Sequence, residues 1–421
     1  MDEIVIKKHR DVDLAFSAPP SKSYTHRALV CAALADGISI IENPLYSGDT
    51  EITCRALGQL GIRTERTADG IIVDGCGGLM PSGGDVAIDC EGSGTSLRFL
   101  AAFALLYQGR VMLTGSARMK ERPVGELAHA LKKLGGKVRF VEKSGYPPVE
   151  ISGRFSGGCV SIDASKSSQF ISSILIPAPY AEKQVDVIPT GSVASESYLD
   201  ITVDVMEKFG AAVERLPGGG FHVPSGSYSS RDYRVEGDYS SASYLFAIAA
   251  VCGGSVTVDN LNPESVQGDT AFVGALASMG CRVIKDADSI SVTRKGPLTG
   301  TDVDMSSSPD TVQTLAAVAA FADSPTRISG ISHLRYKESD RIGAIERMVT
   351  GCGAGFEYRD GVILITPVEL HGFVLDPLDD HRTAMAGAII GLGVGGVTIK
   401  DPACVRKSYP GFWDELKRAG L

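Results

Sequence analysis

The sequence predicts a two-domain α/β protein in which short strands surround buried helices. Three observations support this class. The segment 43–61 recurs at 262–280, and its Gly48 aligns with Gly268 at an offset of 220 residues. Two kinds of helical segment each recur six times along the chain, about 70 residues apart. The length of 421 residues also fits two or three domains of about 150 residues.

The first kind of helix starts with small polar residues and continues as a long apolar run. A helix that is apolar on nearly every face is a buried helix. The small polar residues at each start are typical N-caps. We expect these six helices at 21–37, 92–109, 165–181, 238–254, 306–324 and 379–396.

The second kind of helix is shorter, and each copy stops at a glycine. Gly is the usual residue just past a helix end because it adopts the left-handed conformation at little cost. Short β-branched segments, such as VDVIPTG and GVILITP, lie between the helices and are expected to be strands. Each repeat therefore consists of a helix, a strand, a helix and a strand pair. The six stops are Gly61, Gly135, Gly210, Gly280, Gly353 and Gly420.

The 220-residue offset divides the six repeats into two sets of three, one for each domain. The expected crossings between the domains are 17–20 and the polar stretch 224–234. We therefore predict one domain from residues 1–17 plus 232–421 and a second from residues 18–231.

The charge balance and the cysteines exclude several classes of protein. The chain has 41 Lys and Arg against 50 Asp and Glu, which gives a formal net charge of −9. Because nucleic-acid-binding domains are usually basic, we expect no nucleic-acid partner. The N-terminus is charged from its second residue and no apolar run reaches about 18 residues, so neither a signal peptide nor a membrane span is expected. Nine scattered cysteines without a CxxC pair are typical of reduced thiols in the cytoplasm.

Cationic residues nevertheless gather at the helix starts, where N–H groups already favour anions. Taken singly, each cation is more often a solvated surface charge and each small polar residue a simple cap. Recurrence at one phase of the repeat instead favours a cationic cleft that binds small anions. These residues are Lys22, Arg27, Arg98, Lys120, Arg122, Lys166, Lys337, Arg341, His381, Arg382, Arg406 and Lys407.

Two carboxylates near these cations are candidates for acid–base chemistry. Asp310 stands at the start of a buried helix, and Glu338 lies between two cations. A partly desolvated carboxylate beside cations is suited to proton transfer. Asp49 and Asp269, in the repeated GDT sequence, are instead expected to be N-caps.

Three signatures of nucleotide or metal binding fail. The GLGVGG sequence at 391–396 closes a helix rather than opening one after a strand, so it does not indicate a dinucleotide site. No GxxxxGK[ST] sequence is present, which argues against a P-loop. The seven histidines include no HExxH sequence and no i, i+4 pair, so no metal is expected.

Eight motifs resemble those of the 5-enolpyruvylshikimate-3-phosphate synthase family, and the match runs in order from about residue 4 to the C-terminus. This resemblance implies an inside-out α/β fold with three βαβαββ repeats in each domain and parallel buried helices. It also implies transfer of the enolpyruvyl group of phosphoenolpyruvate to the 5-hydroxyl of shikimate 3-phosphate, through a tetrahedral intermediate, in aromatic amino-acid biosynthesis. The motifs are PPSKSYTHRAL, GSGTSLRFL, LTGSARMKERP, SSQF, SPD, RYKESDR, DDHRTAM and RKSYP.

The resemblance further implies that no cofactor is needed and that the partners are the two anionic substrates. We expect a cytoplasmic monomer that is sensitive to glyphosate, the competitive analogue of phosphoenolpyruvate in this family. His333 stands where some members carry Asn, and Phe99 stands where many bacterial members carry Pro. These departures affect a substrate contact and the geometry of a helix, and neither changes the catalytic assignment.

Residue roles also follow from the resemblance. Asp310 is similar to the residue that accepts the 5-hydroxyl proton, Glu338 to the one that protonates the methylene carbon, and Lys22 to one that contacts both substrates. The implied shikimate 3-phosphate contacts are Lys22, Ser23, Arg27, Ser167, Ser168, Gln169, Ser195, Tyr198, Asp310, His333 and Lys337. The implied phosphoenolpyruvate contacts are Lys22, Gly94, Arg122, Gln169, Arg341, Arg382 and Lys407.

Three other classes of protein are alternatives to this family. The enolpyruvyl transferase that acts on UDP-N-acetylglucosamine has the same fold but uses a Cys in the loop that reads SARMKERP here, which has none. A non-enzymatic anion-binding repeat protein would not need Asp310 or Glu338. An RNA-end-processing enzyme of related fold is disfavoured by the net charge of −9 and by the lack of a nucleophilic His motif.

Overall fold

A computed structural model describes residues 3–80 and 83–421 and divides them into two compact units. Unit 1 comprises the chain up to Pro19 together with Glu236–Leu421, and unit 2 is the continuous segment Pro20–Val235. The crossings fall two and four residues later than the sequence-based boundaries at 17 and 231.

Unit 2 contains three sheets of four strands in its described residues. Each sheet has one parallel pair followed by two antiparallel pairs, in the orders β14-β3-β5-β4, β6-β7-β9-β8 and β10-β11-β13-β12. The strands are β3 (Asp36–Glu42), β4 (Arg63–Arg66), β5 (Gly70–Cys76), β6 (Val86–Asp89), β7 (Val111–Thr114), β8 (Gly136–Phe140), β9 (Val149–Gly153), β10 (Gly158–Asp163), β11 (Val185–Thr190), β12 (Glu214–Leu216), β13 (Gly220–Val223) and β14 (Asp232–Arg234).

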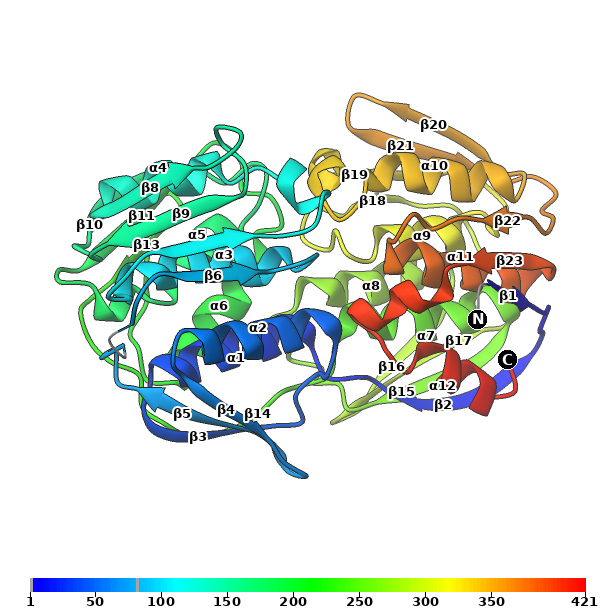
Figure 1. Cartoon of the computed structure of the whole chain (residues 1–421). Helices are drawn as coiled ribbons and strands as arrows, with labels where there is room; N and C mark the ends of the chain where they lie inside the picture. The colour runs from blue at the N-terminus through cyan, green and yellow to red at the C-terminus, as the bar shows by residue number, and fades with distance from the viewer. Residues whose placement is uncertain (1–2, 81–82) are drawn as a thin grey trace. The chain divides into compact units, whose positions relative to one another are not determined.

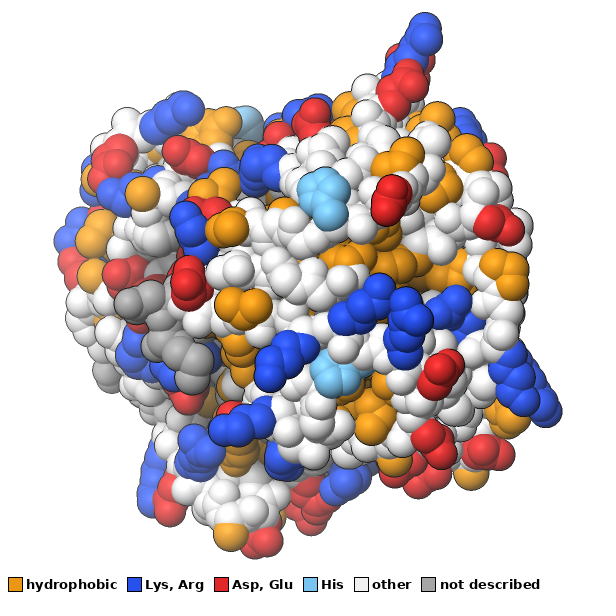
Figure 2. Space-filling model, turned by 90° about the vertical axis from the view of Figure 1, so that its right-hand side faces the viewer, with side chains coloured by type: hydrophobic (Ala, Val, Ile, Leu, Met, Phe, Trp, Pro, Cys, Tyr) orange, Lys and Arg blue, Asp and Glu red, His pale blue; other side chains and the backbone are white. Residues whose placement is uncertain are grey.

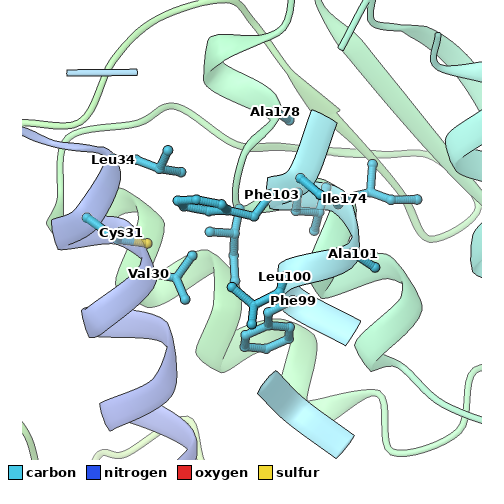
Figure 3. Packing of buried hydrophobic residues seen from close by; sticks show 14 of the residues in the cluster. Val30, Cys31, Leu34, Phe99, Leu100, Ala101, Phe103, Ile174 and Ala178 are labelled. Atoms are coloured by element: carbon cyan, nitrogen blue, oxygen red, sulfur yellow. The ribbon is translucent and has the colours of Figure 1, made fainter. Parts of the chain in front are cut away.

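The helices of unit 2 are of the two expected kinds. The buried ones pack against one another in the core, as Figure 3 shows for side chains of α1, α3 and α5. They are α1 (Lys22–Leu34), α3 (Gly94–Phe103), which η1 (Ala104–Leu106) extends, and α5 (Gln169–Leu175), which η3 (Ala178–Tyr180) follows. The others are α2 (Gly48–Gln59), α4 (Gly125–Lys133) and α6 (Ser197–Lys208), with the short η2 (Met119–Glu121) before α4.

Unit 1 repeats this topology in the part that the structure describes (Figure 1). Two sheets have four strands, in the orders β2-β15-β17-β16 and β18-β19-β21-β20, and a third has the order β22-β23-β1. The strands are β1 (Glu3–Ile6), β2 (Val12–Ser17), β15 (Gly254–Asp259), β16 (Arg282–Lys285), β17 (Ser289–Arg294), β18 (Asp302–Asp304), β19 (Thr326–Ser329), β20 (Gly355–Arg359), β21 (Val362–Thr366), β22 (Val374–Leu375) and β23 (Val397–Lys400).

The central helices of unit 1 are among the most buried elements of the chain. All residues of α7 are buried, because its Ala-rich sequence has no charged residue and offers no polar face to water. The buried helices are α7 (Tyr239–Cys252), α9 (Val312–Ala319) and α11 (His381–Val394). The outer helices are α8 (Ala271–Ser278), α10 (Arg341–Gly351) and α12 (Phe412–Arg418), and the short ones are η4 (Gly268–Thr270), η5 (Ser332–Tyr336) and η6 (Pro402–Lys407).

The surface of unit 1 around its third sheet is mixed in character. Figure 2, which looks onto the side of Figure 1 that carries β1 and β23, shows acidic and basic side chains interspersed with hydrophobic ones. Val5 and Val374 are among the exposed hydrophobic residues, and both pair with Thr398. No helix in the described residues is long and apolar enough to cross a membrane.

The predicted fold class is therefore confirmed. The six buried helices begin one to six residues after their predicted starts, and all six glycine stops have φ between +79° and +103°. The largest delay is at α9, because residues before it form tight turns in which the Ser308 and Thr311 hydroxyls lie 2.7 Å apart. These turns place Asp310 outside the helix, where its side chain is available for other contacts.

Candidate active site

Lys22 is the first residue of α1, and its ammonium is held by a carboxylate. Its Nζ donates to Oδ2 of Asp49 at 3.0 Å, with 14% of the Lys22 side chain and 6% of the Asp49 side chain exposed. The expectation that Asp49 caps α2 was wrong. Ser47 is the cap, in a reciprocal capping box with Thr50, so Asp49 is left to orient Lys22.

Arg27 lies one turn further along α1 and is 2% exposed. Its Nε donates to Oγ1 of Thr202 at 2.8 Å, its Nη1 to the Ser23 carbonyl at 2.9 Å, and its Nη2 to the Tyr198 carbonyl at 3.0 Å and to Oγ of Ser172 at 3.5 Å. Burial lowers the pKa of Arg27 to about 10, so the group stays protonated at neutral pH. These bonds use four of the five guanidinium N–H donors, and the fifth is on Nη1, beside Ser23.

Gln169, the first residue of α5, is fixed by two residues of α3. Its Oε1 accepts from Nη1 of Arg98 at 2.6 Å, and its Nε2 donates to Oγ1 of Thr95 at 2.9 Å. The backbone N–H of Gln169 donates to Oγ of Ser167 at 3.3 Å, and Ser168 occupies the N-cap position of α5. The starts of two buried helices are therefore cross-linked by polar side chains.

Gly94 opens α3 and faces the side chain of Arg122. A Cβ built on Gly94 would lie 2.5 Å from Nη1 of Arg122, which is closer than real Cβ atoms approach other groups. Arg122 is 5% exposed and follows η2, whose Met119 is 2% exposed and anchors the loop. The guanidinium of Arg122 therefore occupies space that a side chain at residue 94 would fill.

Ser195 and Tyr198 lie where α6 begins. Ser195 has a φ of +57°, and its carbonyl accepts from the Tyr198 amide at 3.1 Å. The Ala194 carbonyl accepts from the Ser168 amide at 3.2 Å, which joins this turn to the start of α5. We call these residues of unit 2 the unit 2 cluster; it comprises Lys22, Ser23, Arg27, Gly94, Arg122, Ser167, Ser168, Gln169, Ser195 and Tyr198.

In unit 1, Asp310 is held by two arginines. Its Oδ1 accepts from Nη1 of Arg341 at 2.7 Å, its Oδ2 from Nη2 of Arg382 at 2.9 Å, and its carbonyl from Nη1 of Arg382 at 2.9 Å. Burial alone would raise the pKa of Asp310, but the charges of Arg382 and Arg341 hold that pKa well below its usual range. Asp310 is therefore a carboxylate at neutral pH.

Arg341 connects Asp310 to two other carboxylates. Its Nη2 donates to Oε2 of Glu338 at 2.7 Å, and its Nε to Oδ2 of Asp380 at 3.3 Å. The Arg341 side chain is 1% exposed and that of Asp380 is 0% exposed, whereas 16% of the Glu338 side chain reaches the surface. Asp380 thus has a structural role, while the side chain of Glu338 is partly exposed.

Asp380 was not among the residues singled out from the sequence. It caps α11 through the Arg382 amide at 3.0 Å and accepts from Oγ of Ser339 at 2.6 Å. The two adjacent acids in DDHR were the available signal for it. We call these residues of unit 1 the unit 1 cluster; it comprises Asp310, Glu338, Arg341, Asp380 and Arg382.

Three further predicted residues lie in unit 1 near these groups or on neighbouring elements. His333 is 8% exposed in η5, and burial, together with the charge of Lys337, lowers its pKa to about 3. Lys337 also lies close enough to lower the pKa of Asp310. Lys407 ends η6, which packs against α11, and is half-buried.

Asp269 is a second acid of unit 1 whose expected role needs correction. It lies inside η4 rather than at a helix N-cap. Its Oδ2 accepts from Oγ of Ser240 at 2.6 Å and its Oδ1 from Oγ of Ser308 at 2.9 Å. Burial, followed by the negative charge of Asp310, raises the pKa of Asp269 to about 6. It ties the start of α7 to the turn that carries Asp310.

The repeated fold and the charged clusters at its helix starts define an α/β enzyme for small anionic substrates. The chain matches the family model of EPSP synthase (3-phosphoshikimate 1-carboxyvinyltransferase) over residues 6–416. A 3-phosphoshikimate 1-carboxyvinyltransferase of Methanoculleus marisnigri is 58% identical over 411 residues, 97% of each chain. One from Vibrio atlanticus is 39% identical over 427 residues, with both chains fully covered.

Solved structures agree with the fold. The structure of EPSP synthase from Acinetobacter baumannii superposes with a TM-score of 0.83 at 24% identity, covering 100% of this chain and 99% of that one. The chain therefore belongs to the EPSP synthase family, as the motifs predicted. It is a transferase of the shikimate pathway, of the 3-phosphoshikimate 1-carboxyvinyltransferase type.

Proposed function

We propose that the chain transfers the enolpyruvyl group of phosphoenolpyruvate to the 5-hydroxyl of shikimate 3-phosphate, and that residues of the unit 1 cluster and of the unit 2 cluster take part. The observation that carries this assignment is the bridge from one buried guanidinium, Arg341, to both Asp310 and Glu338. Two carboxylates held at one cation but in different surroundings can act as base and acid of one reaction.

The first step adds a proton and a nucleophile across the enol double bond. Glu338 enters the step as a carboxylic acid and protonates the methylene carbon, which leaves positive charge on the adjacent carbon that bears the phosphate. The 5-hydroxyl attacks that carbon while its proton passes to Asp310, whose depressed pKa keeps it ready as a carboxylate. The product of this step is a tetrahedral ketal phosphate.

The second step eliminates phosphate. Glu338, now a carboxylate, removes a proton from the methyl group, the double bond re-forms and the carbon–oxygen bond to phosphate breaks. The proton held by Asp310 can pass to the departing phosphate, which returns both carboxyl groups to their starting states. Arg341 and Arg382 lie beside Asp310, where they can balance the charge of the phosphoenolpyruvate anion.

The remaining cations and hydroxyls have binding roles in this proposal. Lys22 contacts both substrates, and Gly94, Arg122 and Lys407 contact phosphoenolpyruvate with Arg341 and Arg382. Arginine suits bidentate pairing with carboxylate and phosphate groups, and lysine suits point contacts. Gln169 contacts both substrates. The other residues that bind shikimate 3-phosphate are Ser23, Arg27, Ser167, Ser168, Ser195, Tyr198, His333 and Lys337.

We also propose that the enzyme works as a cytoplasmic monomer. All nine cysteines are free thiols, which suits a reducing compartment. Size-exclusion chromatography with light scattering tests the state of assembly: a mass near 44.2 kDa supports a monomer, and a multiple of it contradicts this.

The decisive experiment measures phosphate release from phosphoenolpyruvate. Release that requires shikimate 3-phosphate supports the proposal, and mass spectrometry should find the carboxyvinyl product. Release with UDP-N-acetylglucosamine instead would overturn the substrate assignment. If neither acceptor leads to phosphate release, the proposed transfer reaction is overturned. Asp310→Asn should slow this release, and Asp302→Asn is its matched control, because Asp302 is 64% exposed and pairs with Arg327 at the surface.

A further inference from the structure

Phe99 presents its ring to the guanidinium of Arg27. The Arg27 Cζ lies 5.2 Å from the centroid of the Phe99 ring, within the roughly 6 Å over which a cation is attracted to an aromatic face. Both residues are 2% exposed, so water does not screen the contact. Figure 3 shows Phe99 extending from α3 near Val30 of α1, the helix that also carries Arg27.

The buried charge of Arg27 has no carboxylate among its hydrogen-bond partners. Its hydrogen-bond partners are two hydroxyls and two carbonyls, which are all uncharged. The buried Arg341 of unit 1, by contrast, is bonded to three carboxylates. The negative face of Phe99 therefore supplies electrostatic compensation that Arg341 obtains from carboxyl groups.

We propose that Phe99 is a positioning residue that holds the Arg27 guanidinium in the orientation needed to bind shikimate 3-phosphate. The inference rests on the proposed function, in which Arg27 contacts that substrate. The guanidinium carbon lies over the Phe99 ring, while four hydrogen bonds hold its N–H groups, so the positions of the group and of the remaining Nη1 donor are both set. A residue without an aromatic ring at position 99 would leave the orientation to the hydrogen bonds alone.

The proposal makes a selective claim about the two substrates. Phe99 is on the same helix as Gly94, whose neighbour Arg122 is assigned to phosphoenolpyruvate. If Phe99 acted only by placing α3, both substrates would be affected. Since the contact is with Arg27, we expect the effect to fall on shikimate 3-phosphate.

The test replaces Phe99 with phenylalanines carrying one, two, three and five ring fluorines. Fluorination weakens the negative potential of the ring face while leaving its shape nearly unchanged. We expect the KM for shikimate 3-phosphate to rise step by step with fluorine number, by about 3- to 30-fold in total. The KM for phosphoenolpyruvate and kcat should change by less than about twofold.

The matched control is the same fluorine series at Phe103. This residue is one turn further along α3, is 0% exposed and lies among Leu34, Cys31 and Ile174 in Figure 3. Fluorination there should leave both KM values unchanged. Phe99→Leu and Phe103→Leu form a second pair, since both remove ring volume from the same core. We expect similar losses in Tm but a raised shikimate 3-phosphate KM only for Phe99→Leu.

Two results would overturn the inference alone: a flat series at Phe99 in an enzyme that binds shikimate 3-phosphate, or equal rises in both KM values. If the unmodified enzyme released phosphate without regard to shikimate 3-phosphate, the proposed function itself would fail and the inference with it. The unmodified protein is therefore measured first.

Discussion

Asp49 and Asp269 occupy the same place in the repeated GDT sequence, yet they have different partners. Asp49 accepts from the ammonium of Lys22 at 3.0 Å, whereas Asp269 accepts from the hydroxyls of Ser240 and Ser308 at 2.6 and 2.9 Å. The two copies of the repeat have thus kept the acid but changed what it holds. One orients a cation and the other orients the turn before α9.

The pKa of Asp269 has a consequence for stability. The unfolded-state pKa of Asp is about 3.9, while in the folded state Asp269 has a pKa of about 6. The folded state therefore keeps a proton that the unfolded state releases, so the free energy of unfolding falls as pH rises from about 4 to about 6 and is level above that. The loss should be of the order of 2 kcal/mol.

Urea unfolding of the wild type and of Asp269→Asn at pH 4 and pH 6.5 measures this loss. The variant should lack most of the pH-dependent decrease. Asp302→Asn, at an exposed site, serves as the control and should follow the wild type. Parallel pH dependence in all three proteins would show that Asp269 does not titrate in this range.

Gly94→Ala should act through Arg122. The new methyl would lie 2.5 Å from Nη1 of Arg122, so the guanidinium must move. We expect the wild type to be sensitive to glyphosate. In Gly94→Ala the KM for phosphoenolpyruvate should rise. The affinity for glyphosate should fall by a larger factor, because glyphosate is longer than phosphoenolpyruvate. Steady-state titrations of substrate and inhibitor measure both.

Gly58→Ala provides the control for Gly94→Ala. It is also a helical glycine of unit 2, but a Cβ there meets nothing within 4 Å. This variant should leave both constants unchanged. Equal factors for inhibitor and substrate in Gly94→Ala would contradict a selective role for residue 94.

Arg27→Ala should weaken binding of shikimate 3-phosphate more than binding of phosphoenolpyruvate. Loss of a charge-assisted contact costs about 1.5–3 kcal/mol, or roughly 10- to 150-fold in affinity. Titration calorimetry measures the two affinities, with Arg55→Ala as a control at a side chain that is 50% exposed. Unchanged affinity for shikimate 3-phosphate would remove Arg27 from the site.

Asp310→Asn should lower kcat by about 10²- to 10⁴-fold, because the amide cannot accept the hydroxyl proton. Its side chain can still accept one hydrogen bond from Arg341 or Arg382, so the fold should persist, as circular dichroism can verify. Steady-state rates decide the matter. A kcat within a few-fold of the wild type would exclude Asp310 as the base.

The pH dependence of activity should contain no contribution from His333. Its pKa of about 3 means that the imidazole is neutral throughout pH 5.5–8. A profile of kcat/KM against pH for His333→Asn should therefore have the same shape as that of the wild type, even if its height differs. A limb that disappears near pH 6.5 in the variant would contradict the low pKa.

Much of the fold was predictable because it repeats. Six apolar helices and six glycine stops are local patterns, and each is visible in about 20 residues of sequence. The role of Asp49 was mispredicted because Ser47, two residues earlier, is an equally good cap and has Thr50 at the reciprocal position. Local sequence alone does not decide between two such candidates.

The charged residues proposed for the site were visible in the sequence, whereas the contacts among them were not. The cations at the helix starts could be recognised from their phase in the repeat. The bond from Arg98 to Gln169 and the contact of Phe99 with Arg27 depend on how neighbouring helices are rotated, and they join residues about 70 positions apart. Asp380 was missed because a buried acid is costly unless it is paired, and its partner Arg341 is 39 residues away.

The strands β1 and β2 have a consequence for how the protein is made. They are synthesised well before their partners, because β2 pairs with β15 at Gly254–Asp259 and β1 pairs with β23 at Val397–Lys400. At about 5–20 residues per second, β1 waits roughly 20–80 s for its neighbour, while the continuous segment Pro20–Val235 is already complete. During synthesis β1 is therefore an unpaired strand tethered to a finished unit. The two lysines that follow it, Lys7 and Lys8, place positive charge beside the strand, which discourages association with other chains.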